Sequence, residues 1–267
     1  MQGVGRRFPR LAAPLPSVTL FVTTTENNRD ACIVAISSAL RMTRWPQLRL
    51  WVATDDQTDE LEAALHSAHL PVAELRVMPR QRGQAEWYDW MLAEAQTDVW
   101  VAIHDDMIFT RRGWLEALVG YLTCHDIILV GGELAAPCEM IEPVGREWVR
   151  ALEALSTWVF AVKSDLREFR PTPTFAFFRG DDPEPGDKRV VGDLGAQLIT
   201  QVKPDGGFAV MPAWFTRYWI HTGHLSWLRE IGGSRDKAWL HAQSRLQAHQ
   251  RRHLVRLAGS VLSQCDI

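Results

Sequence analysis

The chain has 267 residues, of which 46% are hydrophobic and 23% charged, the composition of an ordinary globular protein. Its formal net charge of -3 excludes a strong basic field that would attract nucleic acid. No run of residues approaches the roughly 18 apolar positions of a membrane-spanning helix, and prolines interrupt the N-terminal stretch where a signal peptide would be apolar. The 4 cysteines form no closely spaced pair, which indicates reduced thiols. We therefore expect a cytoplasmic protein without a transmembrane segment and without a nucleic-acid partner.

Short apolar runs alternate with helical spacings through the first half of the chain. Strands are predicted over residues 17–23, 48–53, 72–77, 98–103 and 127–130. Apolar side chains recur every three or four positions between them, which predicts helices over residues 28–41, 58–68, 84–95 and 112–122. This alternation is typical of βαβ units, in which helices flank a mostly parallel sheet.

Beyond residue 132 the alternation is lost. The pattern there predicts a strand over residues 158–163, a long proline-containing loop over 170–186, a helix over 193–202 with Asp193 as its N-cap, a strand over 208–211 and a helical tail over 234–262. We divide the chain into a leader (1–16), a first half (17–132), a second half (133–230) and a tail (231–267). The tail carries arginines, for which a solvated face, a homodimer contact and a membrane-surface helix are the alternatives.

The apolar run over residues 99–103 ends in His104 and two adjacent carboxylates, Asp105 and Asp106. Such a run predicts a strand that is buried on both faces. In open α/β sheets, ligands bind at the carboxyl ends of the strands. Adjacent acids repel each other unless a positive group lies beside them, and hard divalent cations prefer carboxylate and phosphate oxygens. The pair therefore indicates a metal–nucleotide site, with a solvated acidic turn as the alternative.

Four further residues are candidate functional residues, and each could instead have an ordinary structural role. Asp55 follows the second predicted strand, where it could instead cap a helix, and Arg82 precedes a helix, where it could be a solvated surface residue. Asp193 opens a late helix, where an N-cap stabilises by about 1 kcal/mol without any catalysis. His221 precedes a glycine turn that ends in His224, and a lone histidine is often structural.

In order and spacing, these segments resemble the family 2 glycosyltransferases over roughly residues 17–226. The resemblance implies the GT-A fold, in which a Rossmann-like, mostly parallel sheet is flanked by helices. It also implies an inverting enzyme that moves a sugar from a nucleotide sugar to an acceptor hydroxyl, with Mn²⁺ or Mg²⁺ on the diphosphate. Residues 17–132 would then bind the nucleotide sugar and residues 133–230 the acceptor.

The resemblance also implies roles for the donor-binding residues. Asp55 would accept the N3–H of uracil or thymine, which favours UDP or dTDP, and Asp105 would bind the ribose or a water. Asp106 would hold the metal. Weaker assignments to the nucleotide are Thr23, Thr24 and Arg82. His104 stands where the family often has an acid, which leaves the acidic pair as the centre of the motif.

The remaining roles concern the base and the last metal ligand. Asp193 is the candidate general base, although glycine precedes it where the family has glutamate. The alternatives are three acids of the predicted loop, Asp181, Asp182 and Glu184. His221 would complete the metal shell, with His224 as the fallback. Asp89 takes no role, since the family often has asparagine at that position.

Two other functions compete with this one. A sugar-1-phosphate nucleotidyltransferase has a similar sheet but needs a glycine-rich loop after the first strand, and residues 23–28 contain no glycine. An inactive domain that binds a glycan or a partner is the second alternative, which the acidic pair and Asp193 argue against. The chain also has 12 tryptophans, most of them expected in the core, with a sugar-binding cleft as the other place for some.

Overall fold

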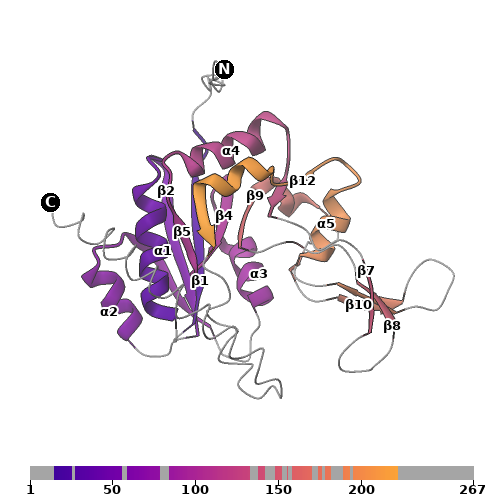
Figure 1. Cartoon of the computed structure of the whole chain (residues 1–267), viewed down its shortest axis with the longest axis horizontal. Helices are drawn as coiled ribbons and strands as arrows, with labels where there is room; N and C mark the ends of the chain where they lie inside the picture. Colours follow the sequence, from indigo (N-terminus) through magenta and orange to yellow (C-terminus); the bar gives the residue numbers. More distant parts are fainter. Residues whose placement is uncertain are drawn as a thin grey trace.

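The computed structural model describes residues 15–25, 28–55, 59–78, 84–132, 138–141, 148–151, 155, 158–169, 174–175, 178–181, 189–192 and 195–221. Its main sheet has 7 strands in the order β12-β6-β9-β4-β1-β2-β3 (Figure 1). They are β1 (Val18–Thr24), β2 (Leu48–Thr54), β3 (Val72–Val77), β4 (Val99–His104), β6 (Leu129–Gly131), β9 (Val159–Lys163) and β12 (Phe208–Val210). β9 runs antiparallel to β4 and β6, and the other neighbouring pairs are parallel.

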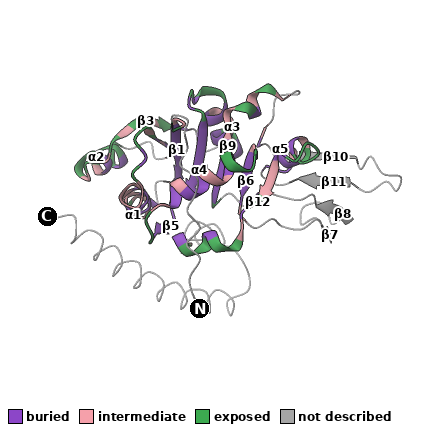
Figure 2. Ribbon diagram, turned by 90° about the horizontal axis from the view of Figure 1, so that it is seen from above, coloured by how far each residue is buried: buried purple, intermediate pink, exposed green. Residues whose placement is uncertain are grey.

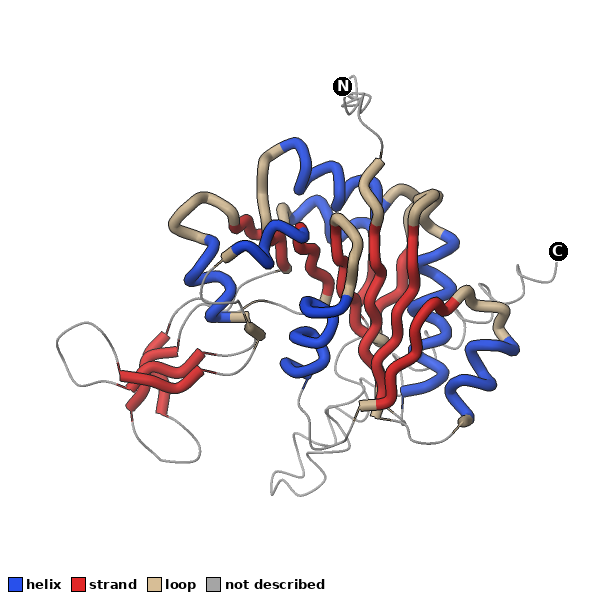
Figure 3. The backbone as a smooth tube through the Cα atoms, turned by 180° about the vertical axis from the view of Figure 1, so that it is seen from behind, coloured by secondary structure: helices blue, strands red, loops and turns tan. Residues whose placement is uncertain are grey.

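Helices cover both faces of this sheet (Figure 3). One face packs on α1 (Arg29–Arg41), α2 (Glu60–Ser67) and α4 (Trp114–Cys124), and the other on α3 (Gln84–Glu94) and α5 (Ala196–Val202). The sequence of β1 is apolar almost throughout because its side chains pack on both faces. Leu20 and Val22 enter the core beside α1, α2 and α4, and Phe21 enters the core beside α3 and α5. Successive side chains of a strand point to opposite faces, so a strand between two helical layers is buried along its whole length (Figure 2).

The described residues also form two smaller sheets. One has 4 strands in the order β10-β11-β8-β7, with bounds β7 (Cys138–Ile141), β8 (Trp148–Ala151), β10 (Phe178–Asp181) and β11 (Arg189–Gly192). It projects from the main sheet beside α5 (Figure 1). The other pairs β5 (Met107–Phe109) with β13 (Trp219–His221), antiparallel, so that His221 lies opposite Met107. Two 3-10 helices, η2 (Ser164–Glu168) and η3 (Ala213–Tyr218), follow β9 and β12.

The elements predicted for the first half are confirmed, with ends shifted by a residue or two. The second half differs from the prediction. β10 lies within the loop predicted over residues 170–186, and β13 follows the strand that was expected to be the last. α5 begins at Ala196 with Gly195 as its N-cap, so the prediction that Asp193 caps this helix is wrong. The helical tail predicted over 234–262 lies outside the described residues.

Two glycines close the contact between α5 and the end of β6. Gly195 has a φ of 74°, in the left-handed region that favours glycine. A Cβ atom on Gly195 would lie 2.8 Å from Cβ of Leu155, and one on Gly131 would collide with the tip of the same side chain. Leu155 is itself buried. The leucine therefore fills a space that exists only because both neighbours lack a side chain.

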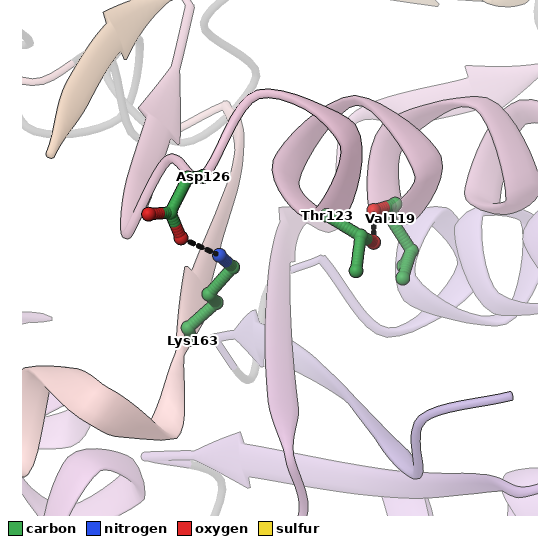
Figure 4. A network of polar contacts seen from close by, with 4 residues as sticks. All are labelled: Val119, Thr123, Asp126 and Lys163. Atoms are coloured by element: carbon green, nitrogen blue, oxygen red, sulfur yellow. Dashed lines mark hydrogen bonds and ion pairs between the residues drawn. The ribbon is translucent and has the colours of Figure 1, made fainter. Parts of the chain in front are cut away.

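The turn after α4 is tied to the end of β9 by polar contacts (Figure 4). Lys163 Nζ lies 3.3 Å from Asp126 Oδ1, and within α4 the Thr123 hydroxyl donates to the Val119 carbonyl at 2.5 Å. Asp126 is fully exposed, so solvent screens its ion pair with Lys163. The buried apolar side chains of β9, rather than this pair, hold the strand in place.

Among the helices of the described residues, none combines the length and the apolar character that a membrane-spanning segment requires.

Candidate functional site

Three parallel strands bring predicted donor-binding residues to one edge of the main sheet. Thr24 is in register with Thr54 on β2, and Thr23 is in register with His104 on β4. Asp55 follows Thr54 and Asp105 follows His104, so the two acids come directly after the strands on either side of β1. This is the carboxyl edge of the sheet, where open α/β proteins bind their ligands.

Asp105 is buried and hydrogen-bonded to the end of β1. The Thr24 hydroxyl donates to Asp105 Oδ2 at 2.8 Å, and Asn28 also donates to this carboxyl group. Burial and the negative charge of Asp106 outweigh these hydrogen bonds and raise the pKa of Asp105 to about 7. A positive group bound beside Asp105 would therefore stabilise its charged form.

Asp106 is paired with a histidine from the far end of the described chain. Because β13 lies beside β5, His221 Nε2 reaches to 3.1 Å from Asp106 Oδ2. Burial acts to raise the pKa of Asp106, but the hydrogen bond and charge of His221 and the charge of His104 prevail and lower it. The two adjacent carboxyl groups thus have pKa values moved in opposite directions, and Asp106 is the one that stays ionised.

His104 is held by a glutamine that the sequence did not single out for a role. Gln84 Nε2, at the start of α3, donates to the Thr23 hydroxyl at 3.2 Å and to the Tyr88 hydroxyl at 2.9 Å. The same nitrogen lies 2.8 Å from His104 Nε2. Only the tertiary structure brings these groups together, since Gln84 and His104 belong to different elements. Gln84 therefore fixes the ring of the histidine that stands before the acidic pair.

Trp158 also lies at this edge and was not predicted as a site residue. Its carbonyl accepts a hydrogen bond from the His104 amide at 3.0 Å, which places the start of β9 beside the end of β4. Its indole stacks on the His221 ring with centroids 4.0 Å apart and planes inclined by 23°. The residue remains 39% exposed. The available signal was only the high tryptophan content and the position of Trp158 at the start of a predicted strand.

Several predicted residues are not brought into this cluster by the described structure. Arg82, Asp193 and His224 lie outside the described residues, as do two of the alternative bases, Asp182 and Glu184. The third alternative, Asp181, is the last residue of β10, so its placement on a loop was wrong.

The arrangement of Asp106 and His221 fits part of the ligand shell of a divalent cation. No group of three or more histidine, cysteine or acidic side chains is arranged to hold a metal in the described part of the chain. Asp106 and His221 offer two donors 3.1 Å apart, close to the separation of about 3 Å between neighbouring ligands with bonds of about 2.1 Å. Carboxylate and imidazole together suit Mn²⁺, and few protein ligands with added phosphate oxygens are typical of Mg²⁺. The pair fits a cation that takes its other ligands from a diphosphate and water.

Asp89, which received no role from the sequence, anchors a segment of the second half onto α3. Its two carboxylate oxygens accept hydrogen bonds from the Thr174 hydroxyl at 2.6 Å and from the Phe175 amide at 2.7 Å. Phe175 is buried, with its ring centroid 5.1 Å from that of Tyr88 and 5.4 Å from that of Phe160. Burial raises the pKa of Asp89 despite both hydrogen bonds. Asp89 is thus a structural residue behind the site.

Replacing Asp89 with alanine is expected to lower the free energy of unfolding by about 1–3 kcal/mol, because it removes both acceptors and leaves the amide beside a buried ring unpaired. Asp89→Asn keeps one acceptor oxygen and should lose less. Urea denaturation of the three proteins measures the difference. Equal stability of Asp89→Ala and the unchanged protein would show that the anchor contributes nothing.

An open, mostly parallel α/β sheet with acids at its carboxyl edge places this chain in the Rossmann-like class of folds. The sequence matches the family model for glycosyl transferase family 2 over residues 21–177, more than half of the chain. The chain therefore belongs to glycosyl transferase family 2 and is a glycosyltransferase, which confirms the resemblance found in the sequence and the predicted α/β fold.

Comparison with solved structures finds similarity to other proteins. One is a mannosyltransferase, PcManGT from Pyrobaculum calidifontis in complex with GDP-Man and Mn²⁺, with a TM-score of 0.47 and 15% identity over 94% of this chain and 75% of that chain. Another is S. aureus TarS, with a TM-score of 0.48 and 11% identity over 91% of this chain and 73% of that chain. Comparison with curated proteins finds no match.

Proposed function

We propose that this glycosyltransferase is an inverting, metal-dependent enzyme. It moves a sugar from a nucleoside-diphosphate sugar, with UDP or dTDP favoured, to an acceptor hydroxyl. The observation that carries the proposal is the contact between Asp106 and His221 beside the buried Asp105, at the edge of the sheet where ligands bind.

The donor nucleotide lies across the carboxyl ends of three strands. Asp55 after β2 accepts the N3–H of the base, Thr23 and Thr24 at the end of β1 border the nucleoside, and Asp105 after β4 binds the ribose. The register of β1 with β2 and β4 supports this order. Arg82 adds a contact to the base or a phosphate.

Asp106 and His221 would hold Mn²⁺ or Mg²⁺ beside the diphosphate of the donor. When bound, the cation neutralises the leaving nucleoside diphosphate as the glycosidic bond breaks. The low pKa of Asp106 supports this role, because the carboxylate is already ionised at neutral pH. His104, fixed by Gln84, adds a polar group beside the carboxylate without replacing it as a ligand.

The acceptor enters from the second half of the chain, residues 133–230. Asp193 takes the proton from the acceptor hydroxyl while that oxygen attacks the anomeric carbon from the face opposite the leaving group. Bound donor and acceptor held in this geometry supply much of the rate enhancement. A cytoplasmic location and a homodimer through the tail over 231–267 stay predictions of the sequence.

Nucleotide binding tests the proposal. UDP or dTDP should raise the melting temperature of the protein by several degrees in the presence of Mn²⁺ and by less in EDTA, because a ligand that binds only the folded state stabilises it by mass action. GDP, whose base offers a different hydrogen-bonding edge, should act more weakly. Absence of any nucleotide-dependent shift, with or without Mn²⁺, would contradict the proposal. Binding of a nucleotide sugar with neither hydrolysis nor transfer would favour the inactive domain instead.

A further inference from the structure

The carboxyl edge continues beyond the acidic pair to a fourth strand. From one side to the other, its strands are β2, β1, β4 and β9. Because β9 is antiparallel to β4, with Val159 in register with Ile103, it is the beginning of β9 that lies at this edge. Trp158 is the residue before Val159, and it follows Asp55, Thr24 and Asp105 along the same edge.

A nucleotide sugar has its parts in a matching linear order of base, ribose, diphosphate and sugar. With the base at β2 and the diphosphate at the end of β4, the sugar ring comes next, at β9. Neighbouring strands are about 4.8 Å apart, so the distance from β2 to β9 is about 14 Å, the span of one extended ligand. The side chain at the start of β9, where the sugar would lie, is the indole of Trp158.

Trp158 is one of two tryptophans, with Trp214, that are exposed among those whose exposure the structure describes. Trp87, Trp100 and Trp114 are buried in the core, whereas Trp158 is 39% exposed. Stacking on His221 covers part of the indole and fixes the plane of the ring. An aromatic ring held next to polar groups offers an apolar surface to the C–H face of a sugar, while the sugar hydroxyls stay near polar partners.

We propose that the indole of Trp158 is the platform on which the transferred sugar of the donor packs. His221 then has two contacts that belong together: its Nε2 faces Asp106 at the diphosphate, and its ring supports the platform for the sugar attached to that diphosphate. The proposal rests on the proposed function, since it needs the donor to lie along this edge.

Isothermal titration in Mn²⁺ separates the sugar from the rest of the donor. The probes are UDP, dTDP and GDP, and beside them UDP-glucose, UDP-N-acetylglucosamine, dTDP-glucose and GDP-mannose. For the nucleotide that binds, Trp158→Ala should weaken the affinity for a nucleotide sugar roughly tenfold and leave the affinity for the free nucleoside diphosphate within about twofold. Trp158→Phe keeps an aromatic ring and should therefore retain most of the affinity for the nucleotide sugar.

Trp214 provides the matched control, because it is also exposed, at 36%, and also stacks on a neighbouring ring, that of Phe215. Trp214→Ala should bind both kinds of probe as the unchanged protein does. An equal loss for nucleoside diphosphate and nucleotide sugar in Trp158→Ala would overturn the proposal, since the indole would then act only by supporting His221. Unchanged binding of every probe in this variant would overturn it as well. Failure of the unchanged protein to bind any nucleotide is a separate result, which contradicts the proposed function itself.

Discussion

Replacing Asp106 with alanine is expected to abolish the Mn²⁺-dependent part of nucleotide binding and to lower turnover by roughly 10²-fold or more. The variant removes the ionised carboxylate that faces His221 at 3.1 Å and leaves a single protein donor at that place. Thermal shifts with UDP or dTDP, recorded with Mn²⁺ and with EDTA, measure the binding part. Transfer or hydrolysis of the nucleotide sugar measures the catalytic part.

Two further variants show whether this loss is specific. Asp205→Asn changes an exposed acid in the turn before β12, at the opposite edge of the sheet, and should change neither quantity. Asp193→Asn should keep the Mn²⁺-dependent shift and lose only turnover, because a base acts on the acceptor. If Asp106→Ala retains the full Mn²⁺-dependent shift, Asp106 is not a ligand.

The second large effect is on stability and comes from Asp105. In the metal-free protein the pKa of this carboxyl group is raised to about 7, mainly by burial and then by Asp106. An unfolded aspartate has a pKa of about 4. Between these two values the folded state holds more protons than the unfolded state, so this group makes the free energy of unfolding fall as pH rises through the window. Above the folded pKa both states are ionised and the cost no longer changes.

Asparagine at position 105 cannot ionise and avoids this cost. The difference in the free energy of unfolding between Asp105→Asn and the unchanged protein should therefore grow in favour of the variant as the pH rises from about 4 to about 7. The total change should be on the order of a few kcal/mol. Above pH 7 the difference should be constant. Urea denaturation in EDTA across this range measures it, with Asp205→Asn as the control. Parallel curves for Asp105→Asn and the unchanged protein would show that Asp105 ionises without cost.

The donor side of the site was predictable because its signals are local. β1, β2 and β4 are apolar runs that end in polar residues, and parallel neighbours necessarily place those ends at one edge. The contact of Asp106 with His221 was suggested by family resemblance alone. It depends on the pairing of β5 with β13, and strands that short carry no readable periodicity.

Other features could not be found from the sequence for identifiable reasons. The N-cap of α5 was assigned to Asp193 because aspartate is a common cap, but the helix starts after a glycine with positive φ. Gln84 and Trp158 act through partners on other elements, so neither has a motif of its own. Strand β10 was hidden because prolines on both sides of it are typical of loops.

The contact of Leu155 with Gly131 and Gly195 has a mechanical consequence. Leu155 is buried, and Gly195 is the N-cap of α5. Since the leucine fits between the glycines without spare room, the start of α5 cannot approach the end of β6 more closely unless Leu155 is displaced. A bulky residue at position 195 would collide with Leu155 and would need a backbone conformation that favours glycine, so it would disturb the contact that joins the start of α5 to the end of β6.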